Sequence, residues 1–272
     1  MASNQAKVIL HWLDGSRAQR ILWLLNELKV PHELKIYHRE KTAFAPPELA
    51  KIHPLGKSPV ITVIPPASAG ADAKELVIAE SGFIIDYLCE HWGHNSSLVP
   101  KKWKDGQEGA VGGETAAWLR YQYLLYYAEG SLMPFLVFSL VTSNLRGPQV
   151  LWLIRPISSA IANKINNVFI VPNVRKNLEL LESYLTTPPA EGDGTGYICG
   201  DRLTAADIML SYPLFGVRER AGGFTIDGKS FQERFPKTME YLGRLENEPG
   251  YLESVETIKK LEGKFEVLPD SM

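Results

Sequence analysis

The sequence predicts an α/β domain followed by an all-α domain. Apolar runs of strand and helix type alternate over residues 8–88, whereas the later part of the chain shows helical patterns without a further convincing pair of strands. The chain has 272 residues, which is long for one hydrophobic core and sufficient for two. We therefore expect a first domain at 1–95, a linker at 96–110 and an all-helical domain at 111–272.

The elements of the first domain follow from apolar periodicity. Residues 8–13 and 34–37 are predicted strands on either side of a helix at 16–28, whose apolar residues recur at helical spacing. Next come a short helix near 47–51, strands at 60–64 and 75–79, and a helix that begins at Ser81. A long loop of small and polar residues at 65–74 joins the last two strands. This order of elements is typical of a thioredoxin-like domain.

A proline opens one of the predicted strands. Val60 and Ile61 are apolar and β-branched, but Pro59 has no N–H group for a strand ladder, so it must stand at the beginning. If the Ser58–Pro59 bond is cis, the backbone N–H and carbonyl of Ser58 face outward and can pair with an extended peptide. The ordinary alternative is a simple edge-strand proline.

The pair Glu80–Ser81 precedes an amphipathic helical pattern. We expect Ser81 to be the N-cap of this helix, where its hydroxyl and the first N–H groups can bind a carboxylate. Glu80 can receive an ammonium group. The alternative is that Ser81 only caps its helix and Glu80 is solvated. Together with Ser58, the pair predicts a site for a small peptide with an α-amino acid end.

Several short motifs, in the same order along nearly the whole chain, resemble those of the yeast-type fungal glutathione transferases. They are HWLDGSRAQRILWLL at 11–25, APPEL at 45–49, IHPLGKSP at 52–59, AESGF at 79–83 and EGSL at 129–132. The resemblance implies the glutathione transferase fold, with a thioredoxin-like domain and an all-α domain that contributes a hydrophobic substrate site. It also implies a homodimer and glutathione as co-substrate, bound by Lys57, Ser58, Pro59, Glu80 and Ser81.

Transferases of this family attack with the thiolate of glutathione, so the protein must lower a thiol pKa of about 8.5. Two pKa units need roughly 2.7 kcal/mol. A hydroxyl that donates to a charged acceptor contributes about 1.5–3 kcal/mol and a helix N-terminus about 0.3–1 kcal/mol, so one serine is sufficient. Ser16, at the start of the first helix, is the catalytic candidate, and a plain helix cap is the equally weighted alternative. This turn contains no cysteine, which disfavours mixed-disulfide chemistry.

The electrophile is expected between the domains, against Trp12 and an aromatic-rich helix at 114–129. Within this helix, Tyr126 and Glu129 are the substrate-binding candidates, although aromatic residues at helical spacing are more often core. Glu129 is unsuited to activate a thiol because a nearby anion raises the thiol pKa. It would instead bind a cationic group of glutathione or point away.

Three functions fit these residues. The first is a glutathione transferase that conjugates hydrophobic electrophiles in detoxification. The second is a glutathione-dependent peroxidase or reductase that uses the same site. The third is a non-catalytic carrier of hydrophobic ligands that retains the glutathione site. A rival based on fold alone is a thioredoxin-like domain with a helical appendage that binds no glutathione.

The composition argues against several other classes. A formal net charge of −2 and a pI near 6.3 do not favour nucleic acid binding. The apolar run at 135–141 is too short to span a bilayer, and without a signal-peptide pattern we expect a cytoplasmic protein with no transmembrane segment. Cys89 and Cys199 have no metal-ligand spacing, so no metal is expected. Thr204 and Asp207 form a capping-box pattern, to which we assign a structural role.

Overall fold

The computed structural model describes residues 6–41, 44–70, 72–94, 96–190, 194–220 and 228–268. They group into two compact units. The first, called here the sheet unit, runs to Val99 and includes the segment from Leu245 onward. The second, the helical unit, comprises Pro100–Arg244. The expected domain limits at 95 and 111 stay predictions, and they differ from these units chiefly in where the C-terminal segment belongs.

The sheet unit contains four strands in the order β2-β1-β3-β4. The strands are β1 (Lys7–Leu13), β2 (His32–Tyr37), β3 (Val60–Ile64) and β4 (Leu76–Ala79). β1 and β2 are parallel because α1 (Ala18–Glu27) connects them, whereas β3 pairs antiparallel with both β1 and β4. A 3-10 turn, η1 (Ala67–Ala69), lies between β3 and β4. The predicted thioredoxin-like order of elements is confirmed.

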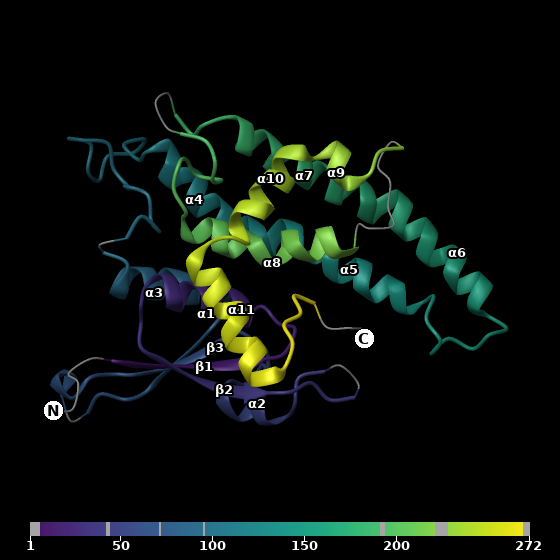
Figure 1. Cartoon of the computed structure of the whole chain (residues 1–272), viewed down its shortest axis with the longest axis horizontal. Helices are drawn as coiled ribbons and strands as arrows, with labels where there is room; N and C mark the ends of the chain where they lie inside the picture. The colour runs from purple at the N-terminus through teal and green to yellow at the C-terminus, as the bar shows by residue number, and fades with distance from the viewer. Residues whose placement is uncertain are drawn as a thin grey trace. The chain divides into compact units, whose positions relative to one another are not determined.

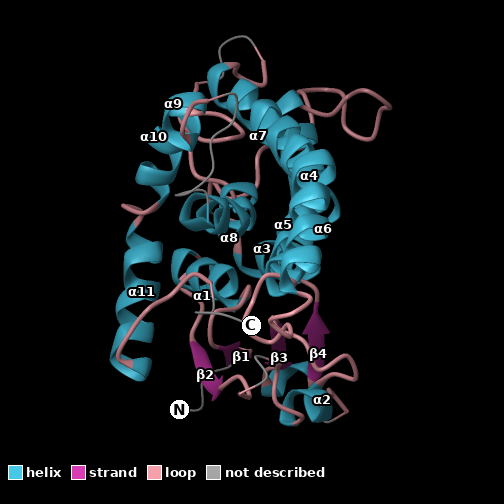
Figure 2. Cartoon of the chain, turned by 90° about the vertical axis from the view of Figure 1, so that its right-hand side faces the viewer, coloured by secondary structure: helices cyan, strands magenta, loops and turns pink. Residues whose placement is uncertain are grey.

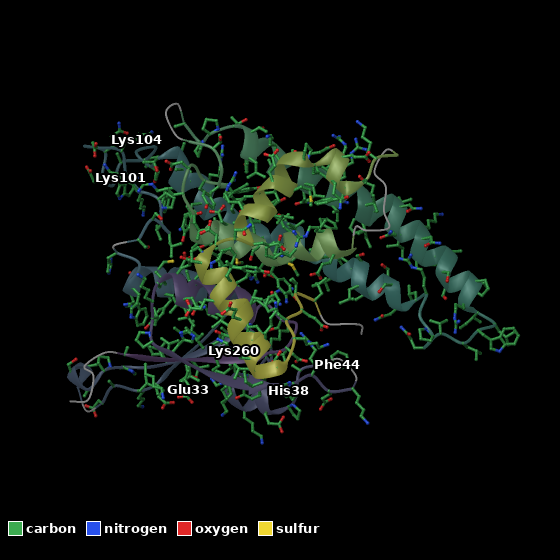
Figure 3. The ribbon with its side chains drawn as sticks, viewed as in Figure 1. Glu33, His38, Phe44, Lys101, Lys104 and Lys260 are labelled. Atoms are coloured by element: carbon green, nitrogen blue, oxygen red, sulfur yellow. The ribbon has the colours of Figure 1, made fainter. Side chains whose placement is uncertain are left out.

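Helices cover both faces of this sheet. Figures 1 and 2 show α1 and α3 (Ser81–Trp92) on one face and the short α2 (Glu48–Ile52) on the other. Val8 and Leu10 of β1 are fully buried in the core of the sheet unit. At the start of β1, Lys7 forms an exposed ion pair with Glu33 of β2; Glu33 is labelled in Figure 3.

A C-terminal helix, α11 (Pro249–Glu262), completes the sheet unit by packing along α1. Asn26 of α1 donates to Ser254 Oγ at 3.0 Å, and Gln19 Nε2 donates to the carbonyl of Val267 at 2.9 Å. Every residue of α1 from Ala18 to Leu25 is therefore buried, not only its apolar stripe. Asn26 thus holds α11, and Gln19 holds the segment that follows it.

The helical unit consists of helices without a sheet in its described residues. Its helices are α4 (Ala116–Tyr127), α5 (Met133–Asn144), α6 (Arg155–Ile165), α7 (Val171–Thr186), α8 (Ala205–Arg220), α9 (Phe231–Arg234) and α10 (Pro236–Leu245). Two π-helical turns, η2 (Ala128–Leu132) and η3 (Asn166–Ile170), join α4 to α5 and α6 to α7. α8 forms the centre of this unit, where it packs on α4 and is buried along most of its length. The expected all-α domain is confirmed.

The continuous helix Ala116–Asn144 is long and apolar enough to cross a membrane. It has 29 residues, and its most apolar 18-residue window has a mean hydropathy of 1.5 and is 33% buried. Core helices of soluble proteins can have the same length and composition, so this helix is weak evidence for a membrane span.

A fully buried carboxyl group holds α8 in the helical unit. Asp207 accepts hydrogen bonds from the N–H groups of Ile198 and Thr204, from the Thr204 hydroxyl and from the Tyr241 hydroxyl, at 2.6–2.8 Å. Burial raises the pKa of Asp207, and these four donors oppose that shift. The pattern noticed in the sequence thus fastens a loop and α10 to the start of α8.

Replacing Asp207 by Ala should lower the free energy of unfolding by roughly 3–5 kcal/mol, because several buried donors lose their acceptor. Urea denaturation of the whole chain measures this loss. Asp207→Asn retains one acceptor oxygen and should lose less. A loss below about 1 kcal/mol in Asp207→Ala would show that the carboxyl group contributes little.

A buried histidine lies between two hydroxyl groups in the sheet. His11 Nδ1 is 3.1 Å from Tyr37 Oη and its Nε2 is 2.9 Å from Thr62 Oγ1. Burial, and then the nearby Lys35 charge, lower the pKa of His11 below 6.5.

Because His11 has a lower pKa in the folded state, the unfolded chain binds its proton first as pH falls below about 6.5. The free energy of unfolding should therefore decrease from pH 7 towards pH 5 more steeply in the wild type than in His11→Gln. Denaturant titrations at a series of pH values give both slopes. Equal slopes would contradict the lowered pKa.

Candidate functional site

The turn between β1 and α1 presents Ser16. Arg39 holds this turn: its backbone N–H donates to Asp14 Oδ1 at 2.9 Å, and its Nε donates to the Asp14 carbonyl at 3.0 Å. Gly15 takes a φ of +50°, which glycine adopts without strain. The N–H of Ala18, the first residue of α1, donates to Ser16 Oγ at 3.2 Å. The hydroxyl thus lies at the positive end of α1 and retains its own proton to donate.

Ser16 meets the segment that begins β3. The two hydroxyl oxygens, Ser16 Oγ and Ser58 Oγ, are 3.1 Å apart. The Ser58–Pro59 bond is cis, and the antiparallel pairing of β3 with its neighbours begins only at Val60. Pro59 is buried, Ser58 is half-buried and Lys57 is exposed. Within the described residues, the backbone N–H and carbonyl of Ser58 therefore take no part in the sheet.

The third segment of the site is the start of α3, and here one prediction was wrong. Ser81 is the first residue of α3 rather than its N-cap, and Glu80 occupies the N-cap position without capping through its side chain. The Ser81 hydroxyl instead accepts a hydrogen bond from Arg20 Nη2 at 2.8 Å. The fully buried Arg20 guanidinium competes successfully for this oxygen because a charged donor in the core needs acceptors.

Glu80 has an unusual backbone conformation. Its φ is +71°, a region that costs a residue with a side chain about 1–2 kcal/mol relative to glycine. Its side chain is exposed. Positions of this kind concentrate at ligand sites, where the strain persists because the conformation serves the site. At Glu80, that conformation ends β4 and directs the chain into α3.

The three segments together offer a defined set of polar groups within the sheet unit. They provide the hydroxyls of Ser16, Ser58 and Ser81, the unpaired backbone of Ser58, the carboxylate of Glu80 and the first N–H groups of α3. A backbone segment, an ammonium group and a carboxylate can each find a partner among them.

The predicted second-substrate residues are distributed over both units. Trp12 is only 1% exposed, and its indole N–H donates to Glu262 Oε1 of α11 at 2.8 Å. Burial raises the pKa of Glu262. In the helical unit, Tyr126 is 71% exposed on α4, and Glu129 is half-buried in η2, three residues further along. Their role in binding a second substrate stays a prediction.

Two arginines of the site were not among the predicted site residues. Arg20 could have been suspected, because it is a charged residue within the apolar stripe of α1 and stands one helical turn after Ser16. Nothing in the sequence pointed to Arg39, because it follows β2 in a polar segment and contacts Asp14 only in the folded structure. Among the described residues, no group of three or more His, Cys, Asp or Glu side chains is arranged to hold a metal ion.

Comparison with known proteins identifies the family. Residues 15–91 match the model of the glutathione S-transferase N-terminal domain, and residues 160–244 match that of the C-terminal domain. Glutathione S-transferase 1 of Saccharomyces cerevisiae is 30% identical over 256 residues, which cover 94% of this chain and 97% of the yeast protein.

Solved structures of glutathione transferases have a similar fold. A glutathione S-transferase from Actinobacillus pleuropneumoniae is 28% identical with a TM-score of 0.62, and 92% of each chain is covered. A protein from Phanerochaete chrysosporium, cocrystallized with 1-(S-glutathionyl)-2,4-dinitrobenzene, has the same fold at 17% identity, with a TM-score of 0.63 over 98% of this chain and all of that chain (100%). This chain belongs to the glutathione S-transferase family and is a glutathione transferase.

Proposed function

We propose that this transferase activates the thiol of glutathione with the Ser16 hydroxyl and directs the thiolate at hydrophobic electrophiles. The observation that carries the proposal is the position of Ser16 at the start of α1, with the Ala18 N–H donating to its oxygen and Ser58 beside it. A hydroxyl that accepts a hydrogen bond becomes a better donor through its own proton. Such a donor favours the thiolate over the thiol and lowers the thiol pKa.

In this proposal the other polar groups bind the rest of glutathione. The unpaired N–H and carbonyl of Ser58 pair with the peptide backbone of glutathione, as an added strand would. The carboxylate of Glu80 binds the α-ammonium group, while the Ser81 hydroxyl and the N-terminus of α3 bind the neighbouring carboxylate. Lys57 is exposed next to Ser58 and suits the second carboxylate of the peptide.

The electrophile is proposed to be apolar and flat, with Tyr126 and Glu129 of the helical unit as candidate contacts; the predicted contact Trp12 is buried and bonded to Glu262, so we do not propose it as a contact. The glutathione conjugate bound by the Phanerochaete chrysosporium protein contains a dinitrobenzene ring, which supports this class of substrate. We also propose a homodimer, a cytoplasmic location and a role in detoxification. These three features rest on the resemblance of the motifs and on the composition.

The carrier function remains a second candidate because of one observation. Ser16 is only 4% exposed, and its hydroxyl already forms a hydrogen bond with Ser58. Either hydroxyl can donate in this bond; if Ser16 is the donor and glutathione does not displace Ser58, the Ser16 proton is not offered to the sulfur. The site would then bind glutathione without activating it.

The thiolate absorbance of bound glutathione, titrated against pH, distinguishes activation from simple binding. In the wild type, the bound thiol should have a pKa well below the free value, and in Ser16→Ala the pKa should rise by about 1–2 units, because a charge-assisted hydrogen bond of about 1.5–3 kcal/mol is lost. Glu80→Gln is the control, expected to bind more weakly with the same bound pKa. An unshifted pKa in the wild type, with glutathione bound, would favour the carrier.

Glu80 allows binding and backbone strain to be separated. Glu80→Gly removes both the carboxylate and the strain, so the free energy of unfolding should rise by up to about 1 kcal/mol while glutathione binds at least about tenfold more weakly. Glu80→Gln keeps the strain and should weaken binding similarly without added stability. Calorimetric titration and urea denaturation measure the two quantities. Wild-type affinity in Glu80→Gln would refute the ammonium contact.

A further inference from the structure

Ser58 brings a second hydroxyl group to the turn that carries Ser16. The backbone of Ser58 suits the peptide of glutathione, but its hydroxyl oxygen lies 3.1 Å from Ser16 Oγ. The two serines are 42 positions apart in the sequence, so the fold brings their hydroxyls together rather than local chain geometry. Ser58 precedes the buried Pro59, which restricts the backbone conformations of the residue before it. The Ser58 hydroxyl therefore approaches Ser16 from a backbone of limited freedom.

The hydrogen-bonding capacity of Ser16 decides how this contact can serve the reaction. A serine hydroxyl has one proton to donate and two lone pairs that accept. The N–H of Ala18 donates to Ser16 Oγ at 3.2 Å, which occupies one lone pair. If Ser58 donates to Ser16, the second lone pair is occupied and the Ser16 proton remains available. If Ser16 donates to Ser58, its single proton is used within the protein.

The charge of a bound thiolate favours one direction of the bond between the two serines. A thiolate attracts a donated proton and repels the lone pairs of an oxygen, so it favours the arrangement in which Ser16 donates to the sulfur. Ser16 Oγ can then only accept from Ser58. In such a chain, each hydrogen bond polarises the next and makes the last donor stronger. Because Ser16 is buried and Ser58 is half-buried, solvent weakens this effect little.

We propose that the Ser58 hydroxyl donates to Ser16 Oγ and thereby directs the Ser16 proton to the sulfur of bound glutathione. Ser58 acts through Ser16 and does not touch the sulfur, so it is a positioning residue rather than a catalytic one. This role rests on the proposed activation of glutathione by Ser16. It gives the Ser58 side chain a function of its own, in addition to the peptide contact of its backbone.

Removing the Ser58 hydroxyl tests the direction of the bond through the sign of the effect. The thiolate absorbance of bound glutathione is titrated against pH in the wild type and in Ser58→Ala. If Ser58 donates to Ser16, the pKa of the bound thiol should rise by about half a unit, less than in Ser16→Ala, because the lost bond acts only indirectly. If Ser58 instead accepts the Ser16 proton, Ser58→Ala frees that proton and the pKa of the bound thiol should fall.

Ser58→Thr and Ser58→Val form a matched pair for the same titration. Threonine and valine have nearly the same shape, but only threonine carries a hydroxyl. Ser58→Thr should keep the wild-type pKa of the bound thiol, whereas Ser58→Val should resemble Ser58→Ala. All three variants keep the backbone of residue 58, so calorimetric titration should show an affinity for glutathione within about twofold of the wild type. A role in packing alone would affect Ser58→Thr and Ser58→Val alike.

A double variant separates action through Ser16 from direct contact with the sulfur. If Ser58 acts through Ser16, Ser58→Ala should not raise the pKa of the bound thiol further in a Ser16→Ala background, because the two residues share one path. A direct contact between Ser58 and the sulfur would raise this pKa in both backgrounds. Ser183→Ala removes an exposed hydroxyl on α7 of the helical unit and is the control, expected to titrate like the wild type.

Three results would overturn the role of Ser58. The first is a bound thiol pKa in Ser58→Ala that is unchanged or lower than in the wild type. The second is the same bound thiol pKa in Ser58→Thr and Ser58→Val. The third is a further rise of this pKa when Ser58→Ala is added to Ser16→Ala. An unchanged pKa in Ser16→Ala would instead refute activation by Ser16 itself, so the failures of the two proposals are distinguishable.

Discussion

The hydrogen bond from Arg20 to Ser81 ties the candidate site to the core of the sheet unit. A buried guanidinium is costly unless its donors find acceptors, and Arg20 finds one on α3, so the packing of α1 and the position of α3 depend on each other. Because Ser16 stands one turn before Arg20 and its hydroxyl meets Ser58, the starts of α1, β3 and α3 are assembled by two side-chain contacts. The site is therefore positioned by core packing rather than by free loops.

The start of α3 determines what this helix can offer a ligand. Ser81 does not cap its own helix because it is the first residue of α3, and the Glu80 side chain does not cap it either. The first N–H groups of a helix without a side-chain cap remain open to an external anion, which the helix dipole also favours. The strained φ of Glu80 places an exposed carboxylate next to them. A ligand with adjacent ammonium and carboxylate groups matches this pair.

The sequence predicts the elements of the sheet unit closely, because their apolar periodicity corresponds to real burial. It could not show that Ser81 bonds to Arg20, since a capping pattern reads the same whether or not a buried charge takes the hydroxyl. The position of the C-terminal segment was equally hidden, because polar residues such as Gln19 and Asn26 give no sign in the sequence that they bond to α11 and to the residues after it. The sequence could not show whether Trp12 lies in a core or in a pocket, because an aromatic residue suits both; in the structure its side chain is buried. Likewise, an apolar helix gives the same pattern whether it is covered or, as in α5, largely exposed.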